Sequence, residues 1–285
     1  MKKVAPAYLA VLLLACGTSC SKRQITTAEV VAAASSTLPP DPQHPAWNNA
    51  PEFSGPLLLQ DLVEPRLMTP STMLIRVRAL TNGTDIAFRL QWLDATLDDA
   101  PGPGRFADGC AVQLPRSPAD EPPAPQMGEL GRPVEIIFWR ADWQAAVNGR
   151  PDSIQSLYPN AAVDHYPFQA PSAEPGSAGQ QAMARRYAPA EALGNRRAGP
   201  RKSPVEDLVA QGPGTLAPAA ETRSDGRGIR SKDGWLVVLR RPLPSDFTPG
   251  KRTQVAFAVW QGSHGEAGAR KMRTGWAPLL RQAGP

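Results

Sequence analysis

Cysteine and histidine are scarce in this 285-residue sequence, with three of each. The histidines, His44, His165 and His264, show neither the HxxxH nor the HExxH spacing of zinc enzymes. Three cysteines make a poor disulfide framework, and Cys110 stands in an apolar segment typical of a buried strand. The sequence therefore argues against both a zinc centre and a fold that depends on disulfides.

Several other signatures are missing as well. There is no GxSxG nucleophile elbow, Walker loop, Rossmann glycine fingerprint or internal repeat. The acidic pairs at residues 98–99 and 120–121 stand in loop-like segments, and nothing selects two carboxylates that would face each other across a cleft. The net charge of +5 is modest, and aromatic residues make up only 6% of the chain. Because no series of aromatic residues interleaves with the scattered basic ones, no nucleic-acid partner is expected.

What the sequence does contain is a series of short apolar segments separated by turns. Proline (32) and glycine (24) are abundant, yet 41% of the residues are hydrophobic and they cluster in short runs. Residues 72–94 form the clearest case, because apolar and polar residues alternate along two arms, 75–79 and 86–92, that flank an Asn82-Gly83 turn. This pattern predicts a β-hairpin.

Similar alternation or short apolar runs predict further strands at residues 55–63, 108–114, 134–139, 235–239, 255–260 and 276–280. In the segment 255–260, apolar side chains point to both sides, which indicates a strand buried on both faces. Many short strands with turns between them predict a mainly β fold, a β-sandwich of short antiparallel strands.

One long stretch, residues 145–230, lacks the strand pattern and is rich in proline, glycine, alanine and serine. Within it, residues 179–186 are expected to form a short helix and residues 204–210 a helix turn. We expect this loop and short-helix insertion to wrap the edge of the sheet and to help cover a ligand.

The first residues have the pattern of a secretion signal. Lys2 and Lys3 precede an apolar core at residues 7–15, which is too short to span a bilayer. The core runs into LLAC, which resembles a bacterial lipobox, so residues 1–15 are predicted to be a lipoprotein signal peptide and Cys16 to carry a lipid anchor. Ordinary cleavage that releases a soluble protein is the alternative. Residues 16–46 have the composition of a flexible tether, and residues 47–281 are expected to form the folded domain.

The segment 255–276, VAFAVWQGSHGEAGARKMRTGW, begins as a strand and breaks into a glycine-rich loop before Lys271. On its chemistry alone, such a lysine is a solvated surface charge. AFAVWQG followed by GARKMRTGW nevertheless resembles the C-terminal signature of the haem b (gamma) subunits of the type II dimethyl sulfoxide reductase family. That family includes ethylbenzene dehydrogenase, dimethyl sulfide dehydrogenase, selenate reductase and chlorate reductase. The matching lysine in these subunits is an axial ligand to the haem iron, and the resemblance assigns this role to Lys271.

The resemblance also assigns the second axial ligand. In these subunits a methionine-glycine pair precedes a strand of the kind PVxIWxWRADW, and here Met127-Gly128 precedes GRPVEIIFWRADWQ. Met127 is therefore the implied partner of Lys271, although a loop methionine by itself usually serves packing. The likeness extends over most of residues 47–280. Residues 116–125 and 171–186 have no clear counterpart, and a lipid anchor is not general in the family.

The resemblance implies a non-catalytic electron-transfer subunit in the periplasm. Its partners would be a molybdenum catalytic subunit, an iron-sulfur subunit and a periplasmic cytochrome or similar carrier. The haem b would be non-covalent, because neither Cys16 nor Cys20 is followed by the histidine of a c-type attachment motif. Lysine binds iron only when neutral, which costs about 4.6 kcal/mol at pH 7 for an amine with the ordinary pKa of about 10.4. Iron ligation and a dry pocket would have to offset this cost.

Two other classes of protein stay open. The family's haem domain resembles carbohydrate-binding sandwiches, so the main alternative is a lipoprotein without haem that binds sugars on aromatic residues. Its platform would use four tryptophans, namely Trp139, Trp143, Trp235 and Trp260, although alternation places Trp235 among core-facing neighbours. A structural lipoprotein without any ligand is the third class.

Overall fold

The computed structural model describes residues 26–100, 102–117, 121–151, 158–161, 174–190, 192–195, 201–244 and 246–283. The predicted signal peptide at residues 1–15, the predicted acylation site Cys16, and His165 lie outside these residues. Within the described ranges, no helix combines the length and the apolar character needed to cross a membrane.

The strands of the described chain form one continuous sheet of 15 strands. Its main path follows the order β10-β9-β8-β7-β13-β15-β2-β5-β6-β12-β11. The strands on this path are β2 (Val30–Ala34), β5 (Leu74–Thr81), β6 (Asp85–Leu93), β7 (Gly109–Pro115), β8 (Val134–Arg140), β9 (Val205–Ala210), β10 (Ala217–Pro218), β11 (Asp225–Arg230), β12 (Gly234–Pro242), β13 (Arg252–Trp260) and β15 (Ala277–Arg281). Four short strands pair outside it, namely β1 (Thr26–Thr27), β3 (Glu52–Pro56), β4 (Leu58–Leu59) and β14 (Met272–Arg273).

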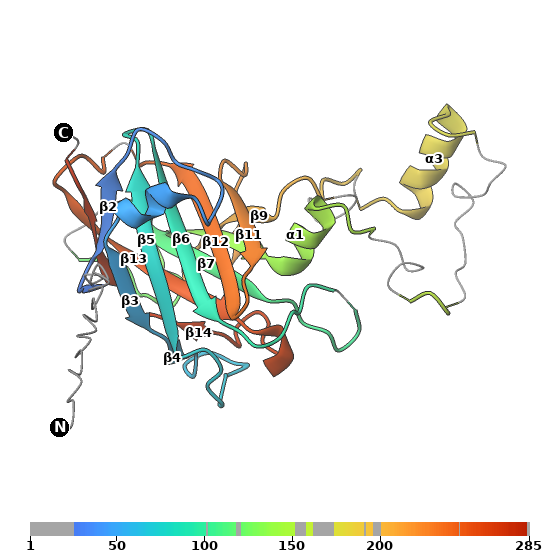
Figure 1. The fold of residues 1–285 in the computed structure, drawn as a ribbon. Helices are drawn as coiled ribbons and strands as arrows, with labels where there is room; N and C mark the ends of the chain where they lie inside the picture. The colour runs from blue at the N-terminus through green and yellow to red at the C-terminus, as the bar shows by residue number, and fades with distance from the viewer. Residues whose placement is uncertain are drawn as a thin grey trace, which may run out of the picture.

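The sheet folds over so that two layers enclose one apolar core (Figure 1). The strands β5, β6 and β12 lie in front of β7 and β13 in this view. Aromatic rings meet across the core: Phe88 of β6 and Phe257 of β13 have ring centroids 6.3 Å apart, and Trp92 of β6 lies 6.4 Å from Trp139 of β8. The prediction of a mainly β sandwich is confirmed. The pairings β1–β3, β2–β15 and β2–β5 are parallel, whereas antiparallel strands were expected throughout.

The predicted hairpin is formed by β5 and β6. The two strands pair antiparallel up to Thr81 and Ile86, and Gly83 in the turn has a φ of +96°, which glycine adopts without strain. Val77, Phe88 and Leu90 point into the core and are fully buried. The alternation in the sequence therefore identified both the strands and their core-facing sides.

The folded part begins before the predicted boundary at residue 47. Strand β2, inside the predicted tether, lies between β15 and β5 and runs parallel to both. Its side chains are small, and Ala32 is fully buried. Because a VVAAA segment shows no alternation between large apolar and polar residues, the sequence did not reveal it as a strand. The described part of the tether, residues 26–46, is thus mostly integrated into the fold.

The predicted insertion at residues 145–230 also contains strands. Residues 205–210, expected as a helix turn, form β9, which pairs antiparallel with β8 and buries Val205, Leu208 and Ala210. β10 and β11 follow before β12. The short helix expected at residues 179–186 is confirmed as α3 (Ala178–Tyr187).

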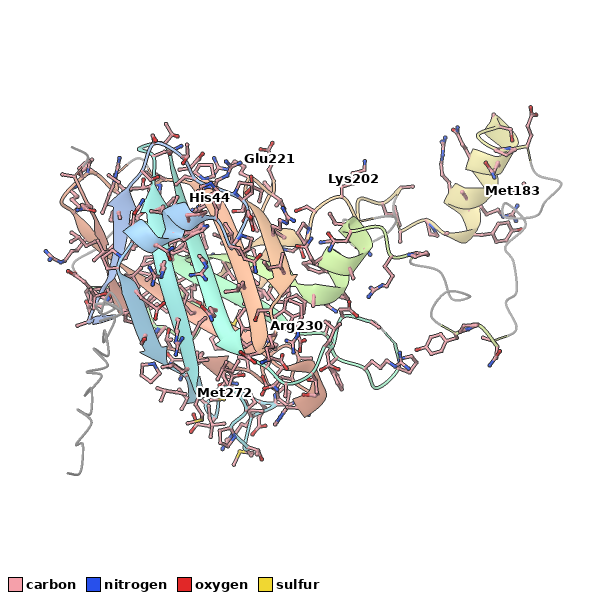
Figure 2. All side chains as sticks on the ribbon, in the orientation of Figure 1. His44, Met183, Lys202, Glu221, Arg230 and Met272 are labelled. Atoms are coloured by element: carbon pink, nitrogen blue, oxygen red, sulfur yellow. The ribbon has the colours of Figure 1, made fainter. Side chains whose placement is uncertain are left out.

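The described helices are few and short. α1 (Ala141–Val147) follows β8 directly and packs against β8 and β11. The turn η1 (Pro45–Asn49) buries Trp47 against β5, and η3 (Gly262–His264) opens the loop after β13. α3 buries none of its residues and stands away from the sheets, so Met183 on this helix lies far from the core (Figure 1, Figure 2).

Candidate functional site

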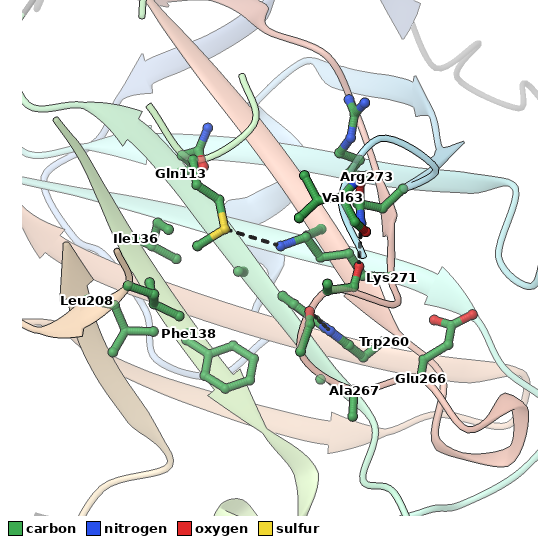
Figure 3. A pocket seen from close by; sticks show the side chains of 18 of the residues that line it. Val63, Gln113, Ile136, Phe138, Leu208, Trp260, Glu266, Ala267, Lys271 and Arg273 are labelled. Atoms are coloured by element: carbon green, nitrogen blue, oxygen red, sulfur yellow. Dashed lines mark hydrogen bonds between the residues drawn. The ribbon is translucent and has the colours of Figure 1, made fainter. Parts of the chain in front are cut away.

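A cavity of about 520 Å³ lies against the layer formed by β7, β8, β9 and β13 (Figure 3). This volume is within the range of small-molecule and cofactor sites, about 300–1,000 Å³. The faces of β7 and β13 that point away from the core carry small side chains here, namely Gly109, Ala111, Ala256 and Ala258. The remaining wall is largely apolar and includes Ile136, Phe138, Leu208, Pro213, Leu216 and Trp260.

The small residues explain why there is a cavity at this place. Successive side chains of a strand point to opposite faces, so the large residues Val112 and Phe257 fill the core while their neighbours on the other face leave room. Two adjacent strands that both carry glycine or alanine at two successive positions of one face are thus the sequence signal for the pocket. This signal was not recognised from the sequence alone.

Lys271 points into the cavity from the residue before β14. Met272 faces the core and is 1% exposed, so the two side chains point to opposite sides. The Nζ atom of Lys271 lies 4.0 Å from the Sδ atom of Met127 and 5.1 Å from the ring centroid of Trp260 (Figure 3). The structure therefore brings together the two predicted ligand residues, which are 144 positions apart in the sequence.

Backbone contacts hold the loop that carries Lys271. The carbonyl oxygen of Lys271 accepts a hydrogen bond from the N–H of Gln60 at 3.1 Å, and the Gln60 side chain donates to the carbonyl of Ala269 at 3.2 Å. The Nε1 atom of Trp260 donates to the carbonyl of Gly268 at 3.1 Å. Gln60 is 4% exposed, so loss of its side chain would leave buried polar groups without partners. Sequence reasoning did not identify this role.

Two buried carboxyl groups hold the beginning of the same loop. Asp108 accepts hydrogen bonds from the N–H of Gly262 at 2.9 Å and from the Nε1 atom of Trp235 at 3.0 Å. Burial is the largest influence on this carboxyl and raises its pKa to about 7, although these hydrogen bonds act in the opposite direction. Glu266 accepts from the N–H of Gln261 at 2.9 Å, and burial raises its pKa as well. No spacing in the sequence pointed to these contacts.

Met127 has an unusual backbone conformation. Its φ of +69° makes it the only non-glycine residue with a positive φ in the described part of the chain. Such a conformation costs about 1–2 kcal/mol for a side chain with a Cβ atom. The next residue, Gly128, also has a positive φ of +77°, and a Cβ atom there would lie 2.9 Å from the carbonyl oxygen of Arg132. The geometry of the loop therefore requires glycine at position 128, whereas methionine at position 127 is tolerated at a cost in backbone strain.

Three contacts fix the Met127 loop against the sheet. The carbonyl of Met127 accepts from the N–H of Gly212 at 2.8 Å. The side chain of Gln113 on β7 donates to the carbonyl of Pro125 at 3.1 Å, and the Nε1 atom of Trp276 donates to the carbonyl of Pro123 at 2.6 Å. The strained methionine is thus held from β7, from the segment before β15 and from the turn after β9.

The cavity makes the amine of Lys271 easier to deprotonate. Burial is the main cause, and the nearby charge of Arg273 adds to it, so that the pKa of Lys271 falls from 10.5 to about 8. No carboxylate forms an ion pair with Lys271 in the described part of the chain, and its described polar contact is the thioether of Met127. The site therefore eases deprotonation of an amine that faces a thioether, and a neutral amine and a thioether can both donate to a metal.

Other residues considered from the sequence lie elsewhere. Of the described methionines, Met127 lines the cavity, whereas Met68 and Met73 are 73% and 62% exposed. His264 is exposed on η3. Among the described residues there is no group of three or more histidine, cysteine, aspartate or glutamate side chains that could hold a metal ion. Cys110 is buried in the core.

The four tryptophans suggested as a sugar platform are all buried. The exposed fractions are 0% for Trp139, 7% for Trp143, 4% for Trp235 and 8% for Trp260. Trp139 and Trp235 pack against each other inside the core with ring centroids 5.1 Å apart, and Trp260 lines the cavity. These residues therefore do not form the exposed aromatic surface that this alternative requires.

The fold and the site define a β-sandwich domain in which a methionine and a lysine face each other in an apolar cavity. A family model described as ethylbenzene dehydrogenase matches residues 44–272, and the chain belongs to this family. The matched range contains both Met127 and Lys271. The family resemblance inferred from the sequence motifs is thereby confirmed.

Three relatives have names that describe subunits. A Haloferax mediterranei protein, proposed to be a respiratory nitrate reductase heme subunit, is 25% identical over 87% of this chain and 70% of its own. The dimethylsulfide dehydrogenase subunit gamma of Rhodovulum sulfidophilum is 24% identical over 82% of this chain and 72% of its own. The chlorate reductase subunit gamma of Ideonella dechloratans is 22% identical over 82% and 75%, respectively.

Solved structures give a more distant likeness. A family 9 carbohydrate-binding module from Caldicellulosiruptor kristjanssonii, in complex with cellotriose, aligns with a TM-score of 0.45 at 10% identity and covers 90% of this chain and 94% of its own. At this level the likeness carries no argument about function.

Proposed function

We propose that this chain is a non-catalytic electron-transfer subunit that binds haem b without a covalent bond, with Met127 and Lys271 as the axial ligands. The observation that carries the proposal is the 4.0 Å separation of the Met127 Sδ and Lys271 Nζ atoms inside an apolar cavity. The relative named as a heme subunit supports the choice of cofactor.

The residues of the site fit this group. The two donor atoms lie 4.0 Å apart, so both side chains would be within reach of a single metal ion. The small side chains of β7 and β13 leave space next to this pair, and the apolar wall suits a large, flat, hydrophobic ligand. The backbone strain at Met127 is of the kind that persists where the surrounding structure fixes a functional residue.

Haem supplies a one-electron carrier when it is bound. Met127 and Lys271 would fill both axial positions, so no coordination site would be left for oxygen or for a substrate, which is the reason to expect a relay and not a catalyst. With a pKa of about 8, holding Lys271 neutral at pH 7 costs about 1–2 kcal/mol, compared with about 4.6 kcal/mol for an ordinary lysine. Desolvation thus prepares the amine for ligation.

The proposed partners are a molybdenum catalytic subunit and an iron-sulfur subunit of one complex, together with a periplasmic cytochrome or similar carrier. Support comes from two relatives that are named gamma subunits of a dehydrogenase and a reductase. The proposed location is the periplasm, with a lipid anchor at Cys16 as one route and simple cleavage as the other. The proposed location rests on the charged start and the apolar core within residues 1–16.

The decisive experiment is an optical spectrum of the purified protein with a pyridine haemochrome assay. We expect a low-spin b-type spectrum and about one haem per chain. Met127→Ala and Lys271→Ala should each convert the iron to a mixed or high-spin form or lose the haem. The matched controls Met183→Ala and Lys251→Ala, on α3 and in the turn before β13, should keep the wild-type spectrum. A folded, colourless protein that does not bind added haem would refute the proposal.

A further inference from the structure

A second cation, Arg273, lines the cavity next to Lys271. The three residues from Lys271 to Arg273 are extended, and the one between them, Met272, points into the core. Alternation along the strand therefore places Lys271 and Arg273 on the same side. Arg273 pairs with Ala258 of β13, one of the small residues that make room for the cavity.

Arg273 forms no ion pair with any acidic residue that the structure describes. Its Nε atom is buried without a hydrogen-bond partner, and its Nη1 atom donates only to the carbonyl of Thr274, at 3.4 Å. Burial lowers the pKa of Arg273, while the more distant, exposed Asp61 raises it. A half-buried guanidinium without a counter-charge is unfavourable, and a ligand carboxylate would remove that cost.

The other half-buried arginine of the cavity differs from Arg273 in this respect. The Nε and Nη2 atoms of Arg140 donate to the two carboxylate oxygens of Asp142 at 2.9 and 2.8 Å, and its guanidinium lies over the ring of Trp143. Arg140 is therefore already neutralised by the protein, whereas Arg273 is available to a ligand.

Arg273 and a group of apolar wall residues lie on opposite sides of Lys271. In Figure 3, Arg273 lies with Val63 on one side of Lys271, whereas Ile136, Phe138 and Leu208 form the opposite side. A flat ligand with carboxylates at one edge and an apolar opposite edge would match this arrangement in one orientation.

We propose that Arg273 binds a carboxylate of the cavity's ligand and thereby sets the orientation of that ligand. The inference rests on the proposed function, under which this carboxylate is a haem propionate. Arg273 is then a binding residue that does not touch the iron. Its planar guanidinium can donate two hydrogen bonds to one carboxylate, which an ammonium group does less well.

The test compares haemin with haemin dimethyl ester, in which both propionates are neutral. The haem-free full chain would be titrated with each compound and followed by the optical spectrum. The wild type should bind haemin about tenfold to a hundredfold more tightly than the ester, as expected for hydrogen bonds to a charged group. Arg273→Gln should bind haemin about as weakly as the ester and leave ester affinity unchanged. Arg140→Gln is the control that should keep the wild-type preference.

The outcomes separate the two proposals. If the wild type binds neither compound, the proposed function and this inference both fail. If the wild type binds haemin with the low-spin spectrum but Arg273→Gln keeps its preference over the ester, only the role of Arg273 is overturned. An equal loss of affinity for haemin and for the ester in Arg273→Gln would also overturn the role of Arg273, because such a loss indicates a structural role. Arg273→Lys provides a second variant, and it should retain part of the preference.

Discussion

Replacing Lys271 with methionine is expected to stabilise the haem-free protein at neutral pH. The cavity lowers the pKa of this lysine from 10.5 to about 8, mainly by burial. Below pH 8 the amine is protonated in both the folded and the unfolded chain, so the folded state bears the full cost of an ammonium group in an apolar site. At 1.36 kcal/mol per pKa unit, and with allowance for its partial exposure, this cost is about 2–3 kcal/mol.

The sign of the pH dependence follows from the same pKa. Between about pH 8 and 10.5 the folded state has lost the proton while the unfolded state keeps it, so the free energy of unfolding of the wild type rises with pH across this window. Denaturant unfolding of the haem-free wild type and of Lys271→Met from pH 7 to 10 measures the effect. The advantage of the variant should be about 2–3 kcal/mol at pH 7 and should shrink above pH 8.

The control for this prediction is Lys251→Met, which changes an exposed lysine in a turn and should show no such pH-dependent difference. Parallel stability curves for the wild type and Lys271→Met would refute the reasoning, because they would mean that Lys271 keeps an ordinary pKa. If Lys271 binds the haem iron as proposed, the proton competes with the iron for the amine in the haem-loaded wild type. Haem affinity should therefore fall by up to about tenfold for each pH unit below 8.

Two further substitutions test the geometry around the pair. Gly128→Ala should cost about 2–4 kcal/mol of unfolding free energy, because the new Cβ atom would lie 2.9 and 3.1 Å from two carbonyl oxygens at a φ of +77°. Gly131 has a φ of +78° and no atom within 4 Å of an added Cβ, so Gly131→Ala should lose only the unfolding free energy that comes from backbone strain. Equal losses of unfolding free energy in the two variants, measured by denaturant unfolding, would argue against the clash. Ala258→Leu should fill the cavity and lower haem affinity by about tenfold or more, whereas Ala182→Leu on the exposed α3 should not. An unchanged haem titration for Ala258→Leu would contradict the assigned cavity.

Local pattern was sufficient to predict the strands that have one buried and one polar face. The two arms of the β5–β6 hairpin alternate clearly, and their register follows from the Asn82-Gly83 turn. The alternation of apolar and polar residues did not identify strands that are buried in other ways. β2 is built of small residues that are buried in the middle of the sheet and do not alternate. In β9, apolar residues at positions 205, 208 and 209 match a helical period by chance, and pairing with β8 determines the outcome.

The site was less accessible to sequence reasoning than the fold. Met127 and Lys271 came only from the family resemblance, because no residue spacing links two side chains 144 positions apart. Their meeting depends on the pairing of β14 with β13 and on the anchoring of the Met127 loop by Gln113 and Trp276. Arg273 was missed because the absence of an acidic partner is a property of the folded chain.

Three unfavourable features meet in this one cavity. They are the positive φ of Met127, the desolvated amine of Lys271 and the Nε atom of Arg273, which is buried without a hydrogen-bond partner. The β5–β6 hairpin and the core strands bury their apolar faces in the usual way, so these features do not reflect a poorly packed domain. One ligand with a metal centre and an acidic edge would use all three, because it would occupy both donors and supply the missing negative charge. Because such a ligand would bind only the folded state, its binding would stabilise the protein and offset these costs.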